Sequence, residues 1–187
     1  MKTIILLLLF SVFSSHGTNA QVPDRSLEGI TFYLVRHAEK DTGNDPVLSM
    51  LGYERAGDLY RFLKNKSIDG IYFSQFRRTK LTGDSLLIYQ QVDTVRYLAD
   101  LTGETVLEKV IANSGKHKNV LVIGHSNTIP AIIKRLGADL AMDLIPDNEY
   151  DNLYIVGYKN HKTTVVKVKY GKSSATENSS PAMKPLQ

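Results

Sequence analysis

The sequence predicts an α/β protein, a three-layer sandwich in which helices flank a mostly parallel central sheet, with an antiparallel edge hairpin near the C-terminus. Continuous apolar and β-branched runs, at 30–35 and 120–123, are typical of strands that are buried on both faces of a parallel sheet. Segments with helical periodicity alternate with such runs, which favours a layered α/β fold. Two alternating runs, 152–158 and 163–170, surround a short polar turn and indicate the hairpin.

The first half of the predicted domain contains two strand–helix units. After the first strand comes a polar loop, 38–48, in which Gly43 and Pro46 favour turns. Ser49 is a suitable N-cap for the helix that follows, and the apolar residues of that helix are spaced to share one face. The elements expected in this half are strand 30–35, helix 49–65, strand 68–73 and helix 77–89.

The second half continues the alternation and then ends in the hairpin. Its clearest buried strand follows the polar segment GKHKN. Pro130 falls in the first turn of the next helix, where proline is tolerated, and Gly137 ends that helix. The elements expected here are strand 92–98, helix 102–113, strand 120–123, helix 128–136 and strands 152–158 and 163–170.

The N-terminal segment has the composition of an export signal. Lys2 precedes an apolar run at 4–13, and small polar residues lead to Ala20. This pattern predicts a signal peptide over 1–20. The alternative, a membrane anchor, is disfavoured because a spanning helix needs about 20 apolar residues. We therefore expect an exported protein, periplasmic or extracellular, without stable membrane insertion after cleavage.

The rest of the chain forms one domain over 21–170, since about 167 residues remain after cleavage and can bury a core. The segment 171–187 is rich in Ser, Lys and Pro and has no periodicity, which predicts a disordered tail. The chain contains no cysteine, which excludes disulfides, thiol chemistry and thiolate metal sites.

The charge balance suits an anionic ligand. The formal net charge is +4, and loss of the signal would remove only Lys2 and leave +3. A nucleic-acid partner is not expected, because no dense stripe of Lys and Arg is present.

Cationic and imidazole side chains follow three of the predicted strands. Arg36 and His37 follow the first strand, Arg78 lies shortly after the second, and His125 follows VLVIG. Because ligands of open α/β sheets bind beyond the carboxyl ends of the strands, these groups can converge. Guanidinium groups match phosphate oxygens, and histidine can act as a nucleophile or move a proton. The helix that opens after His125 would add free backbone N–H groups to an anion site.

The arginines also bear on reactivity. A nucleophilic histidine must be neutral, and nearby positive charge lowers the pKa of an imidazole. If Arg36 and Arg78 lie close to His37, we expect them to keep it unprotonated near neutral pH.

Three ordered motifs resemble those of the histidine phosphatase superfamily, which includes the phosphoglycerate mutases. LVRHAEK is similar to the RHG-type signature, with Ala38 where glycine is commoner. IYFSQFRRTKLTGDS is similar to the second motif, and matching Ser74 and Thr82 to it selects Arg78 rather than Arg77. VLVIGHSNTIPAII is similar to the second-histidine motif. The resemblance spans about residues 30–158.

This resemblance implies roles for the converging residues. His37 would be the nucleophile that becomes phosphohistidine, and Arg36, Arg78 and His125 would bind the phosphoryl oxygens and stabilise charge during transfer. Asn44 is a further candidate phosphate ligand, although it lies one residue farther from His37 than in the mutases. No metal and no cofactor are implied.

The general acid is where the sequence departs from the family. The family often places a Glu or Asp in an insertion before the second histidine, whereas this chain has a short connection. The carboxylates there are expected to be solvated, as are His117, His161 and Arg77. The carboxylates that could act are Asp84, Asp93, Asp100, Glu104 and Glu108, together with Glu39 and Glu149 elsewhere.

Together these features predict a phosphatase that acts on a phosphomonoester or related phosphoryl substrate, either a small molecule or a phosphoprotein. A mutase that returns the phosphoryl group to its substrate is the first alternative. A catalytically idle phosphate-binding domain is the second.

Overall fold

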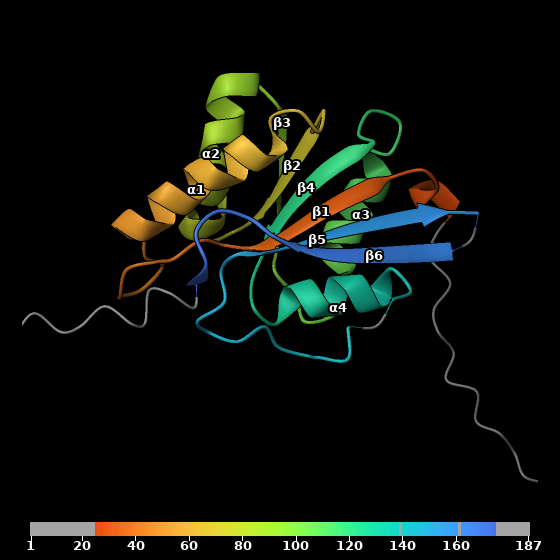
Figure 1. Cartoon of the computed structure of the whole chain (residues 1–187). Coiled ribbons are helices and arrows are strands. Elements are labelled where there is room, and N and C mark those ends of the chain that lie inside the picture. The colour runs from red at the N-terminus through yellow and green to blue at the C-terminus, as the bar shows by residue number, and fades with distance from the viewer. Residues whose placement is uncertain (1–24, 139, 161, 175–187) are drawn as a thin grey trace, which may run out of the picture.

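The computed structural model of the protein describes residues 25–138, 140–160 and 162–174 (Figure 1). The predicted signal peptide, His161 and residues 175–187 lie outside the described residues. A six-stranded sheet has the order β3-β2-β4-β1-β5-β6. Its strands are β1 (Thr31–Arg36), β2 (Gly70–Ser74), β3 (Asp93–Tyr97), β4 (Asn119–Gly124), β5 (Asn152–Lys159) and β6 (Lys162–Lys169).

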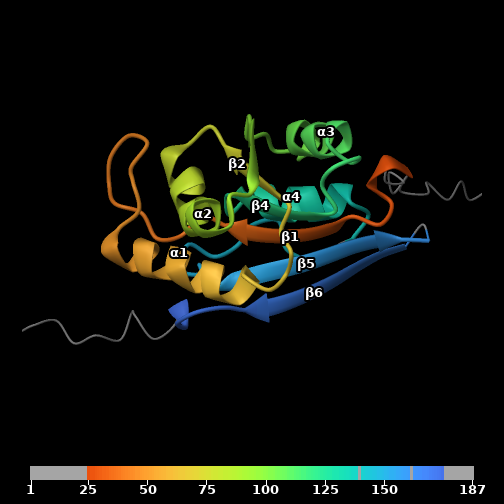
Figure 2. The same ribbon diagram turned by 90° about the horizontal axis from the view of Figure 1, so that it is seen from above.

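Four α-helices complete the three layers. Helices α1 and α2 pack on one face of the sheet against Tyr33 and Val35, whereas α3 and α4 cover the other face against Phe32 and Leu34. Figure 1 shows α1 and α2 above the strands and α4 below them, and Figure 2 gives the view from above. The helices are α1 (Met50–Leu63), α2 (Arg77–Gln90), α3 (Glu104–Ala112) and α4 (Thr128–Arg135), preceded by a 3-10 turn, η1 (Arg25–Leu27).

The predicted fold class is confirmed. Strands β3, β2, β4 and β1 run parallel, and β5 and β6 extend the sheet as an antiparallel hairpin. The central strands β1 and β4 are buried on both faces, which explains their continuous apolar sequences. Each expected element is present, with bounds that differ by no more than two residues.

The two central strands leave the sheet in opposite directions. The chain continues from β1 to α1 on one face, and from β4 to α4 on the other face. Because the two connections separate beyond the carboxyl ends of β1 and β4, a crevice forms there, at the place where α/β proteins bind ligands.

The folded chain continues past residue 170, where the sequence placed the end of the domain. Ser174 is buried and accepts a hydrogen bond from the Tyr150 N–H (3.0 Å). Arg55 of α1 donates to the carbonyl of Lys172 (3.0 Å). The first residues of the predicted tail therefore belong to the domain. Among the helices of the described part of the chain, none combines the length and apolar character needed to span a bilayer.

Candidate active site

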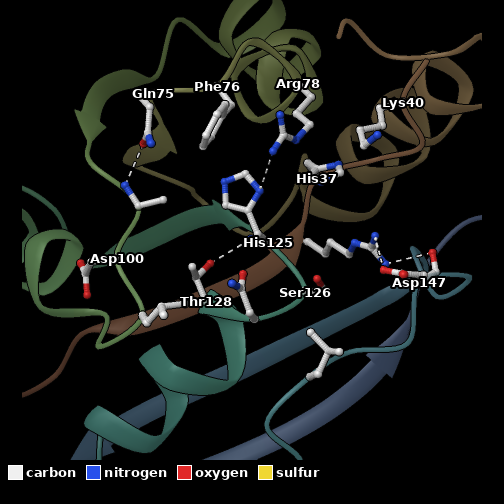
Figure 3. A pocket seen from close by; sticks show the side chains of 15 residues that line it. His37, Lys40, Gln75, Phe76, Arg78, Asp100, His125, Ser126, Thr128 and Asp147 are labelled. Carbon is white, nitrogen blue, oxygen red and sulfur yellow. Dashed lines mark hydrogen bonds and ion pairs between the residues drawn. The ribbon is translucent and has the colours of Figure 1, made fainter. Parts of the chain in front are cut away.

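Strand register brings the two histidine motifs together. Arg36 pairs with Gly124 across the parallel β1–β4 ladder, so His37 and His125 follow neighbouring positions. Their ring centroids lie 5.3 Å apart, close to the ordinary spacing of adjacent strands. The backbone N–H of His37 also donates to the backbone carbonyl of Gly124 (2.9 Å). Figure 3 shows both rings at one pocket, with Arg78 beside His125.

The hydrogen bonds around His37 fix its reactive nitrogen. Its Nδ1 lies 2.8 Å from the carbonyl oxygen of Ala38. Because a carbonyl can only accept, Nδ1 carries the proton and Nε2 keeps its lone pair. The Thr82 hydroxyl accepts from the Ala38 N–H (3.0 Å), which steadies this backbone. Burial is the largest cause that lowers the pKa of His37 to about 3, and the charges of Arg78 and Arg36 lower it further, against the opposing hydrogen bond to Ala38. The ring is therefore neutral at pH 7.

His125 is held by two partners of different chemistry. The Arg78 guanidinium lies 3.4 Å from its Nδ1, and because guanidinium only donates, Nδ1 accepts. The proton therefore resides on Nε2, which lies 2.9 Å from the Ser74 hydroxyl. Burial, together with Arg78 and Arg36, lowers the pKa of His125 to about 4. Both imidazoles are consequently uncharged near neutral pH.

The guanidinium of Arg36 is fixed by the loop that precedes β5. It donates to the carbonyls of Pro146 (2.9 Å) and Asp147 (3.0 Å). It also lies over the ring of Tyr150, 4.3 Å from the centroid. These contacts fix the side chain at the pocket, while its buried Nε–H has no protein partner.

Arg78 enters the pocket from the first turn of α2. Its guanidinium lies 4.3 Å from the centroid of the Phe76 ring and 3.6 Å from the Asp45 carboxylate. Its Nε–H is likewise buried without a protein partner. Arg77 is exposed, and Arg78 rather than Arg77 lines the pocket.

The pocket itself has a volume of about 500 Å³, within the usual range of small-molecule sites. Sequence reasoning missed several of its lining residues. Lys40, Gln75 and Phe76 lie inside the first two motifs and could have been proposed from that nearness. The others come from loops whose path no local pattern predicts. The missed residues are Lys40, Gln75, Phe76, Ala99, Leu101, Leu144 and Asp147.

One predicted ligand does not reach the pocket. Asn44 is exposed and does not line it. Its neighbour Asp45 turns inward instead, with a positive φ of 48°. The Asp45 carboxylate accepts from the Arg77 N–H (3.1 Å) and pairs with Arg78. The structure therefore places Asp45, rather than Asn44, as the residue of this loop that contacts Arg78.

No candidate general acid is placed to donate a proton. Glu39 is buried and ion-paired with Arg55 (2.7 Å). Asp100 is the one residue of the five in the short connection that lines the pocket. Although burial alone would raise its pKa, hydrogen bonds from Thr102 and Thr105 lower it. Asp100 therefore stays ionised and caps the start of α3.

His117 also differs from expectation. It is buried rather than solvated, with Nδ1 2.8 Å from the Tyr72 hydroxyl. It lies at the amino end of β4, away from the pocket. In the described residues, no group of three or more His, Cys, Asp or Glu side chains is arranged to hold a metal ion.

The fold and the site together define a class of protein, an α/β protein with a histidine- and arginine-lined anion pocket at the carboxyl edge of its sheet. Within that class, the model of the histidine phosphatase superfamily (branch 1) matches residues 32–102, which contain the first two motifs. The resemblance to this superfamily is confirmed. No curated protein sequence matches the chain significantly.

Solved structures share the fold. One is a candidate phosphohistidine phosphatase, SixA, from Agrobacterium tumefaciens, with 20% identity and a TM-score of 0.55, covering 77% of this chain and 99% of that chain. Another is the alpha-ribazole phosphatase from Shigella flexneri, with 14% identity and a TM-score of 0.58, covering 75% of this chain and 96% of that chain. A third is a mycobacterial glucosyl-3-phosphoglycerate phosphatase, solved with inorganic phosphate. It has 12% identity and a TM-score of 0.58, covering 78% of this chain and 98% of that chain. At such identities the similarity establishes the fold.

Proposed function

We propose that the protein is a phosphatase that hydrolyses a phosphomonoester or related phosphoryl substrate through a phosphohistidine on His37. The observation that carries this proposal is the tautomer of the His37 ring. Nδ1 donates to the Ala38 carbonyl, so Nε2 offers a lone pair within a pocket lined by two guanidinium groups and a second imidazole. A neutral, oriented imidazole beside fixed cations is the arrangement that nucleophilic phosphoryl transfer requires.

In the first step, Nε2 of His37 attacks phosphorus in line with the leaving group. The P–N bond forms as the bond to the leaving group breaks, and the leaving group departs with the electron pair of that bond. The Nε–H donors of Arg36 and Arg78, which have no protein partner, would bind equatorial oxygens. These cations would stabilise the charge that spreads over the transferring group.

In the second step, water attacks phosphorus on the opposite side from Nε2. The new P–O bond forms, the P–N bond breaks, and its electron pair returns to His37. Both protons of the attacking water leave with the inorganic phosphate, which then releases one to solvent and so balances the proton taken up by the leaving group. The cycle therefore closes with the imidazole in its starting tautomer and consumes one water per substrate.

The leaving group determines which substrates react well. The carboxylates of the pocket are an ionised helix cap, Asp100, and the Asp147 side chain, which is 93% exposed. Because His125 is neutral and its ring N–H faces Ser74, the proton for a departing alkoxide would then come from water, without the 10²–10⁴-fold assistance of a placed acid. We therefore expect aryl phosphates, acyl phosphates, phosphoramidates or anhydrides to be preferred over simple alkyl phosphates. The likeness to candidate phosphohistidine phosphatases, whose named substrate is a phosphoramidate, supports this preference.

A graded series of phosphoesters tests the proposal. kcat/KM should fall steeply as the pKa of the leaving group rises, provided that chemistry limits the rate. Isomerisation that depends on a phosphorylated cofactor, without release of phosphate, would instead identify a mutase. Phosphate binding without turnover would identify an idle domain.

We also propose that the enzyme acts outside the cytoplasm. Lys2, the apolar run at 4–13 and the small residues before Gln21 support this location. Sequencing the N-terminus of the protein from an export fraction should give a start near Gln21. An intact Met1 on cytosolic protein would refute the proposal.

A further inference from the structure

Exposed apolar side chains gather beside the phosphate pocket. Leu101 and Leu144 line the pocket and are 72% and 56% exposed. Met142, two residues before Leu144, is also exposed. Single exposed apolar residues need no explanation, but a contiguous group next to a pocket marks a surface that binds something apolar.

A second concavity continues from this group. We call it the side groove, and its volume is about 270 Å³. It shares Leu101 and Asn127 with the phosphate pocket, so the two are contiguous. One wall comes from α4 and the other from the loop that follows it. The remaining residues of the side groove are Pro130, Ala131, Lys134, Leu140, Met142 and Asp143.

The two concavities differ in chemistry. The phosphate pocket contains both arginines and both histidines. The side groove combines five apolar residues with Asn127, Lys134 and Asp143. Because Lys134 and Asp143 have opposite charges, the groove lacks the cationic cluster of the phosphate pocket. An amphiphile with an anionic head and an apolar body matches this division, because the head would meet the cations while the body covers apolar surface.

We propose that the substrate is a small amphiphilic phosphate whose leaving group is apolar and elongated, and that this leaving group lies in the side groove. This inference rests on the proposed phosphatase function and adds the class of substrate to it. A small molecule fits better than a protein partner, because a stable protein interface buries roughly 800 Å² on each partner. The apolar group here is confined to a few side chains around one groove.

The test varies tail length while leaving-group chemistry stays constant. In 4-alkylphenyl phosphates from methyl to octyl, the alkyl chain barely alters the pKa of the phenol. Below micelle-forming concentrations, kcat/KM should rise roughly twofold per methylene until the groove is filled, and about tenfold or more overall. Turnover that is flat with chain length would overturn the inference and leave the phosphatase proposal intact. If none of the esters is hydrolysed, the phosphatase proposal itself fails.

Groove variants sharpen the test through one ratio, kcat/KM for the octyl ester over kcat/KM for the methyl ester. Ala131→Asp places a carboxylate in the groove wall, and Met142→Ser removes apolar surface from a loop without risk to a helix. Both should bring the ratio towards 1. Ile88→Ser is the matched control, since Ile88 is an exposed apolar residue of α2 (68%) that lies outside both concavities. A ratio that Ala131→Asp and Met142→Ser leave unchanged, or a strong preference for a phosphopeptide over every aryl ester, would contradict the proposal.

Discussion

The two ends of the sheet each bury histidine, but they surround it with opposite charge. At the carboxyl end, His37 and His125 are 3% and 8% exposed and lie among arginines. At the amino end, His117 is 2% exposed and lies between two oxygen groups. Its Nδ1 faces the Tyr72 hydroxyl, and its Nε2 lies 3.5 Å from the Asp93 carboxylate. Equal burial therefore accompanies different chemistry, and the sign of the neighbouring charge separates the two ends.

The amino end is built for packing. A Cβ on Gly70 would lie 2.5 Å from the ring of His117, so the absence of a side chain at that position makes room for it. Burial, with Asp69 and Asp93, raises the pKa of Tyr72 to about 12 and keeps its hydroxyl protonated. The amino end thus pairs one ring nitrogen of His117 with Tyr72 and leaves the other beside the Asp93 carboxylate, whereas the carboxyl end offers the Nε2 lone pair of His37 and two guanidinium groups.

The largest expected effect belongs to His37. His37→Ala should lower kcat/KM by roughly 10⁴-fold or more, because no neighbouring group can replace the covalent step. After an alkaline quench of the reaction, the wild-type protein should carry a phosphoryl label that mild acid removes, and the variant should carry none. His117→Ala is the matched control from the other end of the sheet and should still be labelled. Undiminished labelling of His37→Ala would disprove the assignment.

A somewhat smaller effect should distinguish the adjacent arginines. Arg78→Ala should lower kcat/KM by about 10²–10³-fold, since a charged contact to the transferring group is lost. Arg77→Ala should change it little, because that side chain is exposed. Steady-state kinetics of the two variants with one aryl phosphate decide the matter. The reverse order would place the phosphate ligand one residue earlier.

The carboxyl end of the sheet could largely be predicted from the sequence, and the reason is local. Arg36, His37 and His125 directly follow apolar runs that form central strands, and strand register then places them side by side. Arg78 was found through its spacing from Ser74 and Thr82, and the hydroxyls of those residues hold His125 and Ala38 in the structure. Short-range pattern and sheet geometry were sufficient for this part.

The rest depends on contacts between residues far apart in sequence. The carbonyls of Pro146 and Asp147 bind Arg36 across 110 and 111 positions, and no local pattern reports such a contact. His117 was expected in solvent because its neighbours are polar, yet its ring fills the space above Gly70. Glu39 lies within the first motif, yet it is paired with Arg55 of α1. The paths of loops over the sheet decide these cases.

The third prediction concerns the pH dependence of stability. The pKa values of His37 and His125 are lowered to about 3 and about 4, below the value of about 6.5 expected in the unfolded chain. Between these limits the unfolded state binds more protons, so stability rises with pH there and falls as pH drops below about 6.5. Between pH 7 and pH 5, protonation of these two histidines in the unfolded chain should lower the free energy of unfolding by roughly 2–4 kcal/mol.

Urea unfolding of the wild type and of a His37→Gln/His125→Asn double variant measures this contribution. The difference between the two proteins isolates the rings from the carboxylates, which also titrate. The wild type should lose more stability between pH 7 and pH 5 than the double variant. Parallel losses in both proteins would show that neither ring is shifted as described.

The fourth prediction tests the structural role of the amino end. His117→Gln should leave kcat/KM unchanged and lower the free energy of unfolding by about 1–3 kcal/mol, through a weakened bond to Tyr72 and poorer packing. Chemical unfolding and one kinetic assay are sufficient. A large loss of activity at full stability would mean that the amino end communicates with the pocket, and the contrast between the two ends would then fail.

The smallest expected effect concerns Asp45, whose carboxylate pairs with Arg78 at the arginine-lined end of the sheet. Its carboxylate is about one-third exposed, so the ion pair contributes little to stability. Its negative charge nevertheless opposes a phosphate dianion and competes for the same guanidinium. Asp45→Asn keeps an oxygen acceptor for the Arg77 N–H and removes only the charge. Inhibition by inorganic phosphate should therefore become about two- to fivefold tighter, and the gain should shrink at high salt.

Asp147→Asn is the matched control, because Asp147 also pairs with an arginine of the pocket but is 93% exposed, and it should show a weaker change. Weaker phosphate binding in Asp45→Asn would mean that the carboxylate positions Arg78 for the anion, and the sign of the surrounding charge would then be less important than the orientation it imposes.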